Sequence, residues 1–278
     1  MRIDSHNHFW KYEPKTHAWI DESMKVIRRD FLPKDFKNVL QGNQIDGTIA
    51  VQAEQTEDDT YFLLRLADQF SFIKGVVGWV DLQAEDIADR LQTFSACDKL
   101  VGFRHMVQSE TDPNFMLKEE FQRGLGLLKD FNFTYDILVY PNQLEMILKS
   151  IEQNPEQKFV INHLAKPNIK AGEFKEWAKM MKSIGSHKNV MCKLSGLVNE
   201  ADWKHWSRPD FKTYLDLTLQ VFGIDRVMFG SDWPVCLVAA QYDQVKGIIS
   251  SYFESSPVAD LDKVFGLNAM KFYEIDDR

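Results

Sequence analysis

Residues 4–10 of the chain read DSHNHFW, and this short segment places His6 and His8 two positions apart, close to Asp4. Imidazole side chains bind divalent metal ions, and they also donate hydrogen bonds to an oxygen on which negative charge develops. Side chains at i and i+2 of a strand lie on the same face, because successive side chains alternate between the two faces. The pair therefore predicts a metal or catalytic site at the end of a first strand.

The elements that must position these histidines follow from the hydrophobic pattern. Short β-branched or aromatic runs predict eight strands, at residues 2–9, 47–54, 73–82, 100–107, 133–140, 158–164, 189–196 and 226–232. Stretches of helical periodicity predict helices at residues 34–41, 58–70, 85–94, 119–131, 141–153, 172–184, 210–222 and 260–275. A long irregular loop is expected at the start of residues 11–42.

Eight β-then-α units follow one another with no linker or low-complexity segment between them. This order favours a single-domain (β/α)8 barrel over residues 1–278, and an open doubly wound α/β sheet is the alternative. Barrel enzymes assemble their active sites at the C-terminal ends of the strands. We therefore expect the chemistry at that end of the barrel.

The composition limits the partners of the protein. Lys and Arg number 33 against 41 Asp and Glu, a net charge of −8 with no basic block, which disfavours nucleic acid and anionic membranes. No apolar run is long enough to span a bilayer, and the first residues lack the apolar region of a secretory signal. Three cysteines without CxxC spacing argue against a disulfide framework. We expect a soluble, cytoplasmic protein with a small-molecule partner, and the sequence leaves a homo-oligomer open.

Titratable side chains recur where the other predicted strands end. They are Glu54, Arg104, His105, Asp136, His163, Lys193 and Asp232. Packing alone does not explain polar groups concentrated at strand ends, so they are candidates for the same site as the two histidines.

Several segments together resemble one known family. They are DSHNHFW at 4–10, GFRH at 102–105, NHLAKP at 162–167, CKLSGLVNEA at 192–201 and MFGSDWPV at 228–235. The chain resembles the amidohydrolase superfamily and, more narrowly, its sugar-lactonase group of L-fuconolactonase-like and L-rhamnonolactone hydrolase-like proteins. The HxH pattern is loose by itself, whereas the ordered succession of the last three segments is specific. The resemblance implies a distorted (β/α)8 barrel that hydrolyses the lactone of a sugar acid, an enzyme of carbohydrate metabolism.

The resemblance also implies roles for individual residues. It suggests that His6, His8 and His163 line the metal or substrate-carbonyl site and that Asp232 is the catalytic carboxylate. Two-metal members of the superfamily carry a bridging lysine on a middle strand, and the segment DILVY at 136–140 has none. We therefore expect at most one divalent metal ion, with zinc as the first choice, or no metal, since related lactonases work without one.

The chemistry of these groups supports a hydrolase in either case. Three imidazoles and one carboxylate form a ligand set suited to Zn²⁺ or Mn²⁺, with an open position for water. Without a metal, Asp232 would accept the proton of an attacking water, while the histidines of this set, with Arg104 or His105, would hold the carbonyl oxygen. The alternative is that Asp232 is a turn residue before residues 233–234.

Further candidates concern the substrate. Side chains expected to bind sugar hydroxyls are Glu54, Arg104, Asp136 and Lys193, and those expected to form aromatic walls are Trp10, Trp79 and Trp233. Structural alternatives remain open: Trp79 as a core residue, Lys193 in a buried ion pair with Asp136 or Glu54, and Arg104 as a structural fork to a carboxylate. The expected substrate is a neutral five- or six-carbon aldonolactone, and the resemblance favours deoxy sugars of the fucose or rhamnose type.

Two other functions remain as alternatives. One is a metal-dependent decarboxylase or amide hydrolase of the same superfamily, which would need a firmly held metal and a more cationic pocket. The other is a catalytically silent carbohydrate-binding barrel. It is disfavoured because all four candidate catalytic side chains are present.

Overall fold

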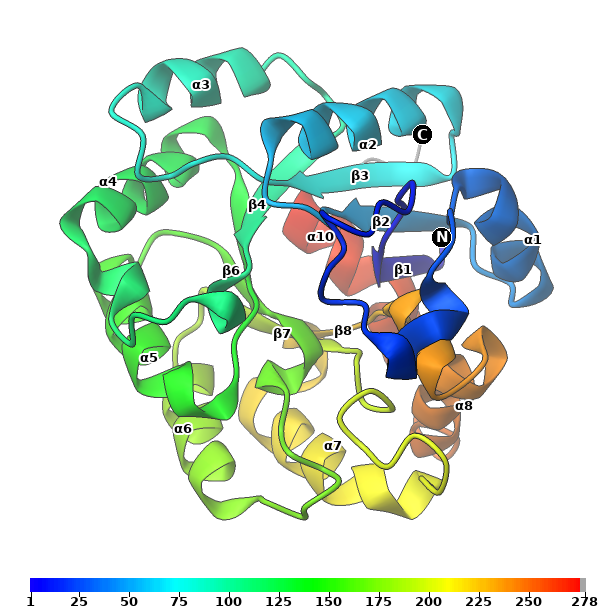
Figure 1. Ribbon diagram of the computed structural model, residues 1–278. Helices are drawn as coiled ribbons and strands as arrows, with labels where there is room; N and C mark the ends of the chain where they lie inside the picture. The colour runs from blue at the N-terminus through cyan, green and yellow to red at the C-terminus, as the bar shows by residue number, and fades with distance from the viewer. Residues whose placement is uncertain (276–278) are drawn as a thin grey trace.

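Eight parallel strands form the centre of the molecule. The computed structural model describes residues 1–275, so the last three residues of the expected single domain lie outside it. The strands are β1 (Ile3–Asn7), β2 (Gly47–Val51), β3 (Ile73–Gly78), β4 (Leu100–His105), β5 (Thr134–Ile137), β6 (Phe159–Ile161), β7 (Val190–Leu194) and β8 (Val227–Phe229). Each strand pairs in parallel with the next one along the chain, and all eight lie within the predicted ranges (Figure 1).

The barrel closes between β1 and the segment that follows β8. The backbone N–H of His8 donates to the carbonyl of Trp233 at 2.7 Å, and the N–H of Asp232 donates to the carbonyl of His6 at 2.9 Å. The structure is therefore a (β/α)8 barrel, as predicted, and not an open sheet. The same two bonds bring the histidine segment of β1 beside Asp232, although these segments lie at opposite ends of the sequence.

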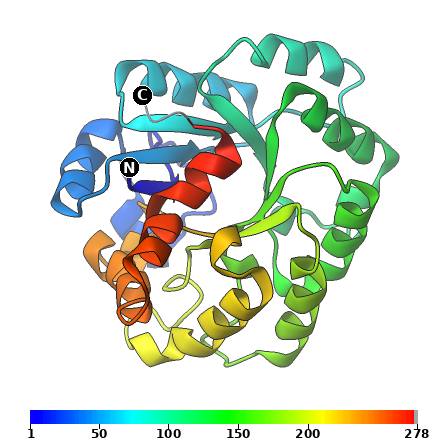
Figure 2. The same ribbon diagram turned by 180° about the vertical axis from the view of Figure 1, so that it is seen from behind.

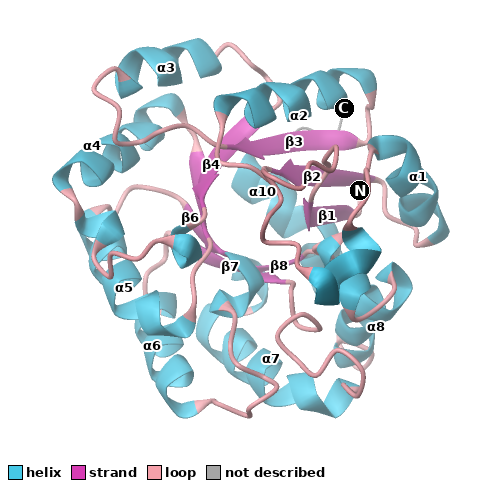
Figure 3. Ribbon diagram, in the orientation of Figure 1, coloured by secondary structure: helices cyan, strands magenta, loops and turns pink. Residues whose placement is uncertain are grey.

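Helices cover the outside of the barrel (Figure 3). They are α1 (Pro33–Gly42), α2 (Glu57–Gln69), α3 (Ile87–Phe94), α4 (Glu119–Leu127), α5 (Leu144–Gln153), α6 (Lys175–Gly185), α7 (Arg208–Phe222), α8 (Tyr242–Tyr252), α9 (Val258–Asp262) and α10 (Asn268–Tyr273). Helix α8 was not predicted, because Gly247 and the β-branched pair that follows it weaken its helical signal. The helix expected at 260–275 is instead three successive segments: α9, a π-helical turn at Lys263–Leu267, and α10.

Helix α10 covers the N-terminal end of the barrel. Its side chains Ala269 and Phe272 pack with Val160, Met191 and Met228 from the strands. Figure 2, seen from behind, shows this helix in red lying across the barrel. The N-terminal end is thus sealed with apolar side chains, and the polar strand ends lie at the opposite, C-terminal end.

Candidate functional site

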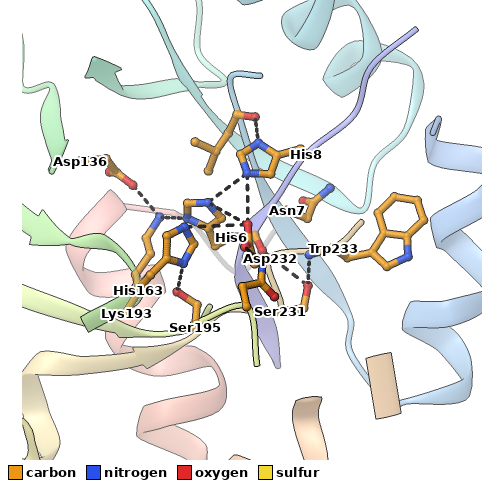
Figure 4. Close-up of polar contacts among 12 residues, drawn as sticks. His6, Asn7, His8, Asp136, His163, Lys193, Ser195, Ser231, Asp232 and Trp233 are labelled. Carbon is orange, nitrogen blue, oxygen red and sulfur yellow. Dashed lines mark hydrogen bonds and ion pairs between the residues drawn. The ribbon is translucent and has the colours of Figure 1, made fainter. Parts of the chain in front are cut away.

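Four of the predicted site residues meet at the C-terminal end of the barrel. His6 lies on β1 and His8 directly follows that strand. His163 lies in the turn Asn162–Ala165 (η6) after β6, and Asp232 lies in the segment after β8. All four side chains are buried. Figure 4 shows them converging from three different parts of the barrel wall.

One oxygen of Asp232 faces all three imidazoles. Its Oδ1 lies 3.3 Å from Nε2 of His8, 3.7 Å from Nε2 of His6 and 3.8 Å from Nε2 of His163. The two β1 histidines also face each other, with 3.2 Å between their Nε2 atoms. The other carboxylate oxygen, Oδ2, accepts a hydrogen bond from Nδ2 of Asn199 at 3.0 Å, which fixes the plane of the carboxylate.

The backbone that presents two of these groups is left-handed. Residues 163–166 have φ values of 54°, 52°, 56° and 50°, and Asp232 has a φ of 57°. For a residue other than glycine this conformation costs about 1–2 kcal/mol, so the surroundings must hold it in place. One such contact is the indole N–H of Trp177, which donates to the carbonyl of Leu164 at 2.7 Å. The strained positions coincide with the predicted catalytic groups.

Three of the four side chains fit a divalent metal ion. The ligand atoms of His6, His8 and Asp232 all lie within 4.8 Å of one another. Ligands placed about 2.0–2.2 Å from a tetrahedral zinc ion lie about 3.3–3.6 Å apart, close to the spacings found here. Nδ1 of His8 donates to the carbonyl of Val51 at 2.8 Å, which leaves its Nε2 unprotonated for a ligand. His163, expected as a fourth ligand, lies outside this group of three.

The burial of the site sets the charge of each group. Burial lowers the pKa of His6 well below its usual value, and it lowers the pKa of His163 to about 3, so these rings are neutral. Burial alone would raise the pKa of Asp232, but the neighbouring His163 and His8 hold it below its usual value. Neutral imidazoles therefore surround an ionised carboxylate. This is the state required both of metal ligands and of a general base.

Two buried cations flank the histidines. Nη1 of Arg104 lies 3.4 Å from Nε2 of His6, and burial lowers the pKa of Arg104 to about 10. Nζ of Lys193 lies 2.6 Å from Asp136 and 3.2 Å from Nδ1 of His6. Lys193 and Asp136 thus form the buried ion pair considered as an alternative, and direct substrate contact by either side chain stays a prediction.

A cavity of about 150 Å³ opens above these groups. Its polar and charged lining residues include His8, Arg104, His163, Lys166, Asp232, Gln108 and Ser109, and its apolar ones include Trp19, Ala53, Met106, Leu138 and Val235. Sequence reasoning did not select Trp19 or Lys166 as site residues. Trp19 lies in the irregular loop, where no periodicity indicates its direction, whereas Lys166 belongs to the NHLAKP segment and could have been found there.

The three tryptophans expected as aromatic walls are absent from this cavity lining. Trp10 is buried, and its indole N–H donates to the carbonyl of Arg29 at 2.8 Å. Trp233 is stacked on Phe36 with 4.3 Å between ring centroids. The indole N–H of Trp79 donates to Nδ1 of a histidine, His105, at 3.3 Å.

Two titratable candidates also lie beside the cavity instead of lining it. Nε2 of His105 is 2.7 Å from Glu110, and its ring is stacked on Phe115. Glu54 lies 3.6 Å from Nε2 of His17, a residue of the loop before α1. The catalytic role expected for His105 and the substrate contact expected for Glu54 therefore stay predictions, and both residues are placed to fasten loops around the cavity.

Comparisons with known proteins agree with this geometry. The model of the amidohydrolase family matches residues 3–275. An L-fucono-1,5-lactonase of Burkholderia multivorans is 37% identical over 100% of this chain and 97% of its own length, and an L-fucono-1,5-lactonase of Burkholderia ambifaria is 33% identical over 99% and 96%. A crystal structure of an amidohydrolase from Burkholderia multivorans with bound zinc superposes with a TM-score of 0.95, at 37% identity over 99% of this chain and 100% of that chain.

Proposed function

Because the chain belongs to the amidohydrolase family, we propose that it is a lactonase that opens the ring of a sugar-acid lactone such as L-fucono-1,5-lactone. The observation that carries this proposal is the ionised Asp232 carboxylate, surrounded by neutral imidazoles at the base of a small cavity. The similarity to two L-fucono-1,5-lactonases supports the substrate class.

In the proposed reaction a water molecule attacks the lactone carbonyl carbon and gives a proton to Asp232. The carbonyl oxygen becomes negatively charged in the tetrahedral intermediate, and the Arg104 guanidinium lines the cavity where it can stabilise this charge. When the intermediate collapses, the bond from the carbonyl carbon to the ring oxygen breaks. Asp232 then returns its proton to the ring oxygen, which becomes a hydroxyl of the open-chain acid.

The proposed function includes a site for one divalent ion. His6, His8 and Asp232 would hold a divalent ion, with zinc as the first choice because a similar amidohydrolase has been crystallised with it. When bound, such an ion polarises the carbonyl and makes a water molecule more acidic. His163 would then remain free to donate to substrate oxygens, with its Nδ1 held 2.8 Å from the hydroxyl of Ser195.

The cavity suits a small polyhydroxylated ring. Its volume of about 150 Å³ is below the roughly 300–1,000 Å³ typical of sites for drug-sized ligands. Arg104, Lys166 and Gln108 offer hydrogen bonds to hydroxyls, whereas Trp19 and Leu138 offer apolar contact to the C–H side of a sugar. The lining therefore offers both polar groups for the hydroxyls of an aldonolactone and apolar surface for its C–H groups.

The other functions are less well supported. A decarboxylase or amide hydrolase is not favoured by the similar lactonases, and a silent binding barrel does not account for a carboxylate held among three imidazoles. None of the helices within residues 1–275 is long and apolar enough to cross a membrane. We further propose a single domain over residues 1–278 in a reducing compartment such as the cytoplasm, since Cys97, Cys192 and Cys236 are free thiols.

A panel of lactones tests the proposed function. Hydrolysis of L-fucono- and L-rhamnonolactones is measured with a pH indicator, with and without chelator, beside an unsubstituted lactone of equal ring size. Polar groups in a site that binds hydroxyls lose their partners when the hydroxyls are missing, so kcat/KM for the unsubstituted lactone should be lower by roughly 100-fold or more. Similar kcat/KM values would contradict the proposal and favour a decarboxylase or amide hydrolase.

A further inference from the structure

The helix that seals the far end of the barrel sends one polar side chain into it. Tyr273, the last residue of α10, donates a hydrogen bond from its hydroxyl to Asp136, with 3.0 Å to Oδ1 and 3.3 Å to Oδ2. Its ring centroid lies 5.4 Å from Nζ of Lys193. Tyr273, Asp136 and Lys193 are all buried, so these contacts are made without competition from bulk water.

Asp136 and Lys193 extend this contact to the active site. Oδ2 of Asp136 lies 2.6 Å from Nζ of Lys193, and the same Nζ lies 3.2 Å from Nδ1 of His6 (Figure 4). A lysine ammonium group is only a donor, so Nδ1 of His6 accepts from it. His6 is therefore connected through two side chains to a helix at the opposite end of the barrel.

From Lys193 to His8 the directions of the hydrogen bonds agree, although the Arg104 guanidinium, which only donates, also faces Nε2 of His6 at 3.4 Å. A neutral His6 that accepts at Nδ1 carries its proton at Nε2, which lies 3.2 Å from Nε2 of His8. His8 in turn donates from Nδ1 to the carbonyl of Val51 at 2.8 Å. Both ring nitrogens of His6 are thus held, one from each side. If a divalent ion bound Nε2 of His6, the ring proton would lie on Nδ1, and Lys193 would have to be a neutral amine to accept it.

We propose that Tyr273 is a positioning residue of the active site, which acts through Asp136 and Lys193 to hold the ring of His6. Without the tyrosine hydroxyl, Asp136 keeps Lys193 as its remaining side-chain donor, so the carboxylate is free to turn and to move the Lys193 ammonium group relative to His6. Buried polar groups that lose a partner rearrange or pay a desolvation cost, so the change should reach the histidine. The kinetic part of this inference rests on the proposed lactonase function, whereas the structural part does not.

The test compares Tyr273→Phe with a matched control, Tyr214→Phe. Tyr214 of α7 is also buried and donates a single hydrogen bond, to the carbonyl of Glu173 at 3.1 Å, so its hydroxyl is not part of the Asp136–Lys193–His6 series. Metal-free protein labelled with ¹⁵N-histidine is examined by NMR, and the His6 ring signals are assigned by their loss in His6→Gln. We expect Tyr273→Phe to shift or broaden the His6 ring signals and Tyr214→Phe to leave them unchanged.

Kinetics on the best lactone provide a second readout. Mutating a residue that orients a metal-ligating histidine typically costs roughly 10- to 100-fold in metal affinity or activity. Tyr273→Phe should therefore lower kcat by roughly 10-fold while KM stays within about twofold. Unchanged His6 signals in Tyr273→Phe would overturn the proposal and leave Tyr273 as a packing residue. Asp136→Asn, which replaces one acceptor oxygen by a donor, should shift the same signals, and its failure to do so would also overturn it. If the wild type hydrolyses no lactone, the proposed function fails, and the NMR comparison still decides the role of Tyr273.

Discussion

Nε2 of His8 lies 3.3 Å from Oδ1 of Asp232, and the other nitrogen of the same ring is bound to the carbonyl of Val51. The lone pair of the imidazole therefore points at the carboxylate. Two such groups at this distance can share either a proton or a divalent ion, so the same geometry serves a hydrolase with or without a metal.

The metal content follows from this pair and from His6. Because His6, His8 and Asp232 are the only ligand group of this kind within residues 1–275 and β5 carries no lysine, we expect at most one divalent ion per chain by elemental analysis. His8→Ala should weaken zinc binding by at least roughly 10-fold in a chelator competition. The control is His205→Ala, which removes an exposed histidine. Two tightly held ions per chain, or unchanged affinity in His8→Ala, would contradict the assignment of the ligands.

Trp19 is expected to contact the sugar ring. Its side chain lines the cavity and is still 41% exposed, so an aromatic face remains for a ligand. Stacking contributes about 0.5–1.5 kcal/mol beyond area burial, so Trp19→Ala should raise KM by roughly 3- to 10-fold with little change in kcat. Trp19→Phe should largely restore the KM of the wild type. An unchanged KM in Trp19→Ala would remove Trp19 from the binding site.

The position of the His163 side chain requires that residue 196 have no side chain. A Cβ atom at Gly196, where φ is 68°, would lie 2.7 Å from Cβ of His163. Gly172 has a similar φ of 67° but open space around it, so Gly172→Ala measures the backbone strain alone. We expect Gly196→Ala to lose about 1–3 kcal/mol more stability than Gly172→Ala and to lower kcat, because the imidazole must move. Equal effects of the two substitutions would show that His163 tolerates the added methyl group.

The strand pattern predicted the fold because parallel barrel strands are buried on both faces and read as short apolar runs. The closure bond between His8 and Trp233 then follows from the architecture, since the first and last strands must meet. Helix α8 was not predicted because its sequence has a weak helical pattern and packing against the barrel stabilises it. Tertiary contacts therefore decided this element, as they often do for weak helices.

The site was predictable to the extent that strand ends define it. His6, His8, His163 and Asp232 converge because every strand of a barrel ends at the same face. The directions of the surrounding side chains were not predictable. Trp233 packs inward against Phe36 of α1 and Trp10 packs against Phe31, whereas Trp19 lines the cavity from a loop whose path has no periodic signature.

Asp59 of α2 gives the protein a measurable pH dependence of stability. Its Oδ2 accepts the backbone N–H groups of Ala53 and Glu54 at 2.8 and 3.1 Å, and burial raises its pKa from 3.8 to about 6. The folded state therefore binds this proton more tightly than the unfolded state. The contribution of the bound proton to the free energy of unfolding is fully present below about pH 4 and is lost as the pH rises through about 6.

Asp59→Asn removes this titration while its amide oxygen can still accept the two backbone bonds. The free energy of unfolding of the wild type, relative to that of Asp59→Asn, should rise by on the order of 1–2 kcal/mol as the pH falls from about 7.5 to about 5. Urea denaturation at each pH measures the difference. A difference that does not vary with pH would mean that Asp59 titrates at its ordinary value.

The most direct measurement is the turnover of the best sugar lactone by Asp232→Asn. An amide keeps the shape of the side chain but cannot accept the proton of the attacking water, so kcat should fall by roughly 10²–10⁴ while the fold is retained. Asp216→Asn, which changes a partly exposed carboxylate on α7, serves as the control and should keep the wild-type rate. Wild-type turnover in Asp232→Asn would contradict the proposed mechanism and leave Asp232 as a turn residue before Trp233.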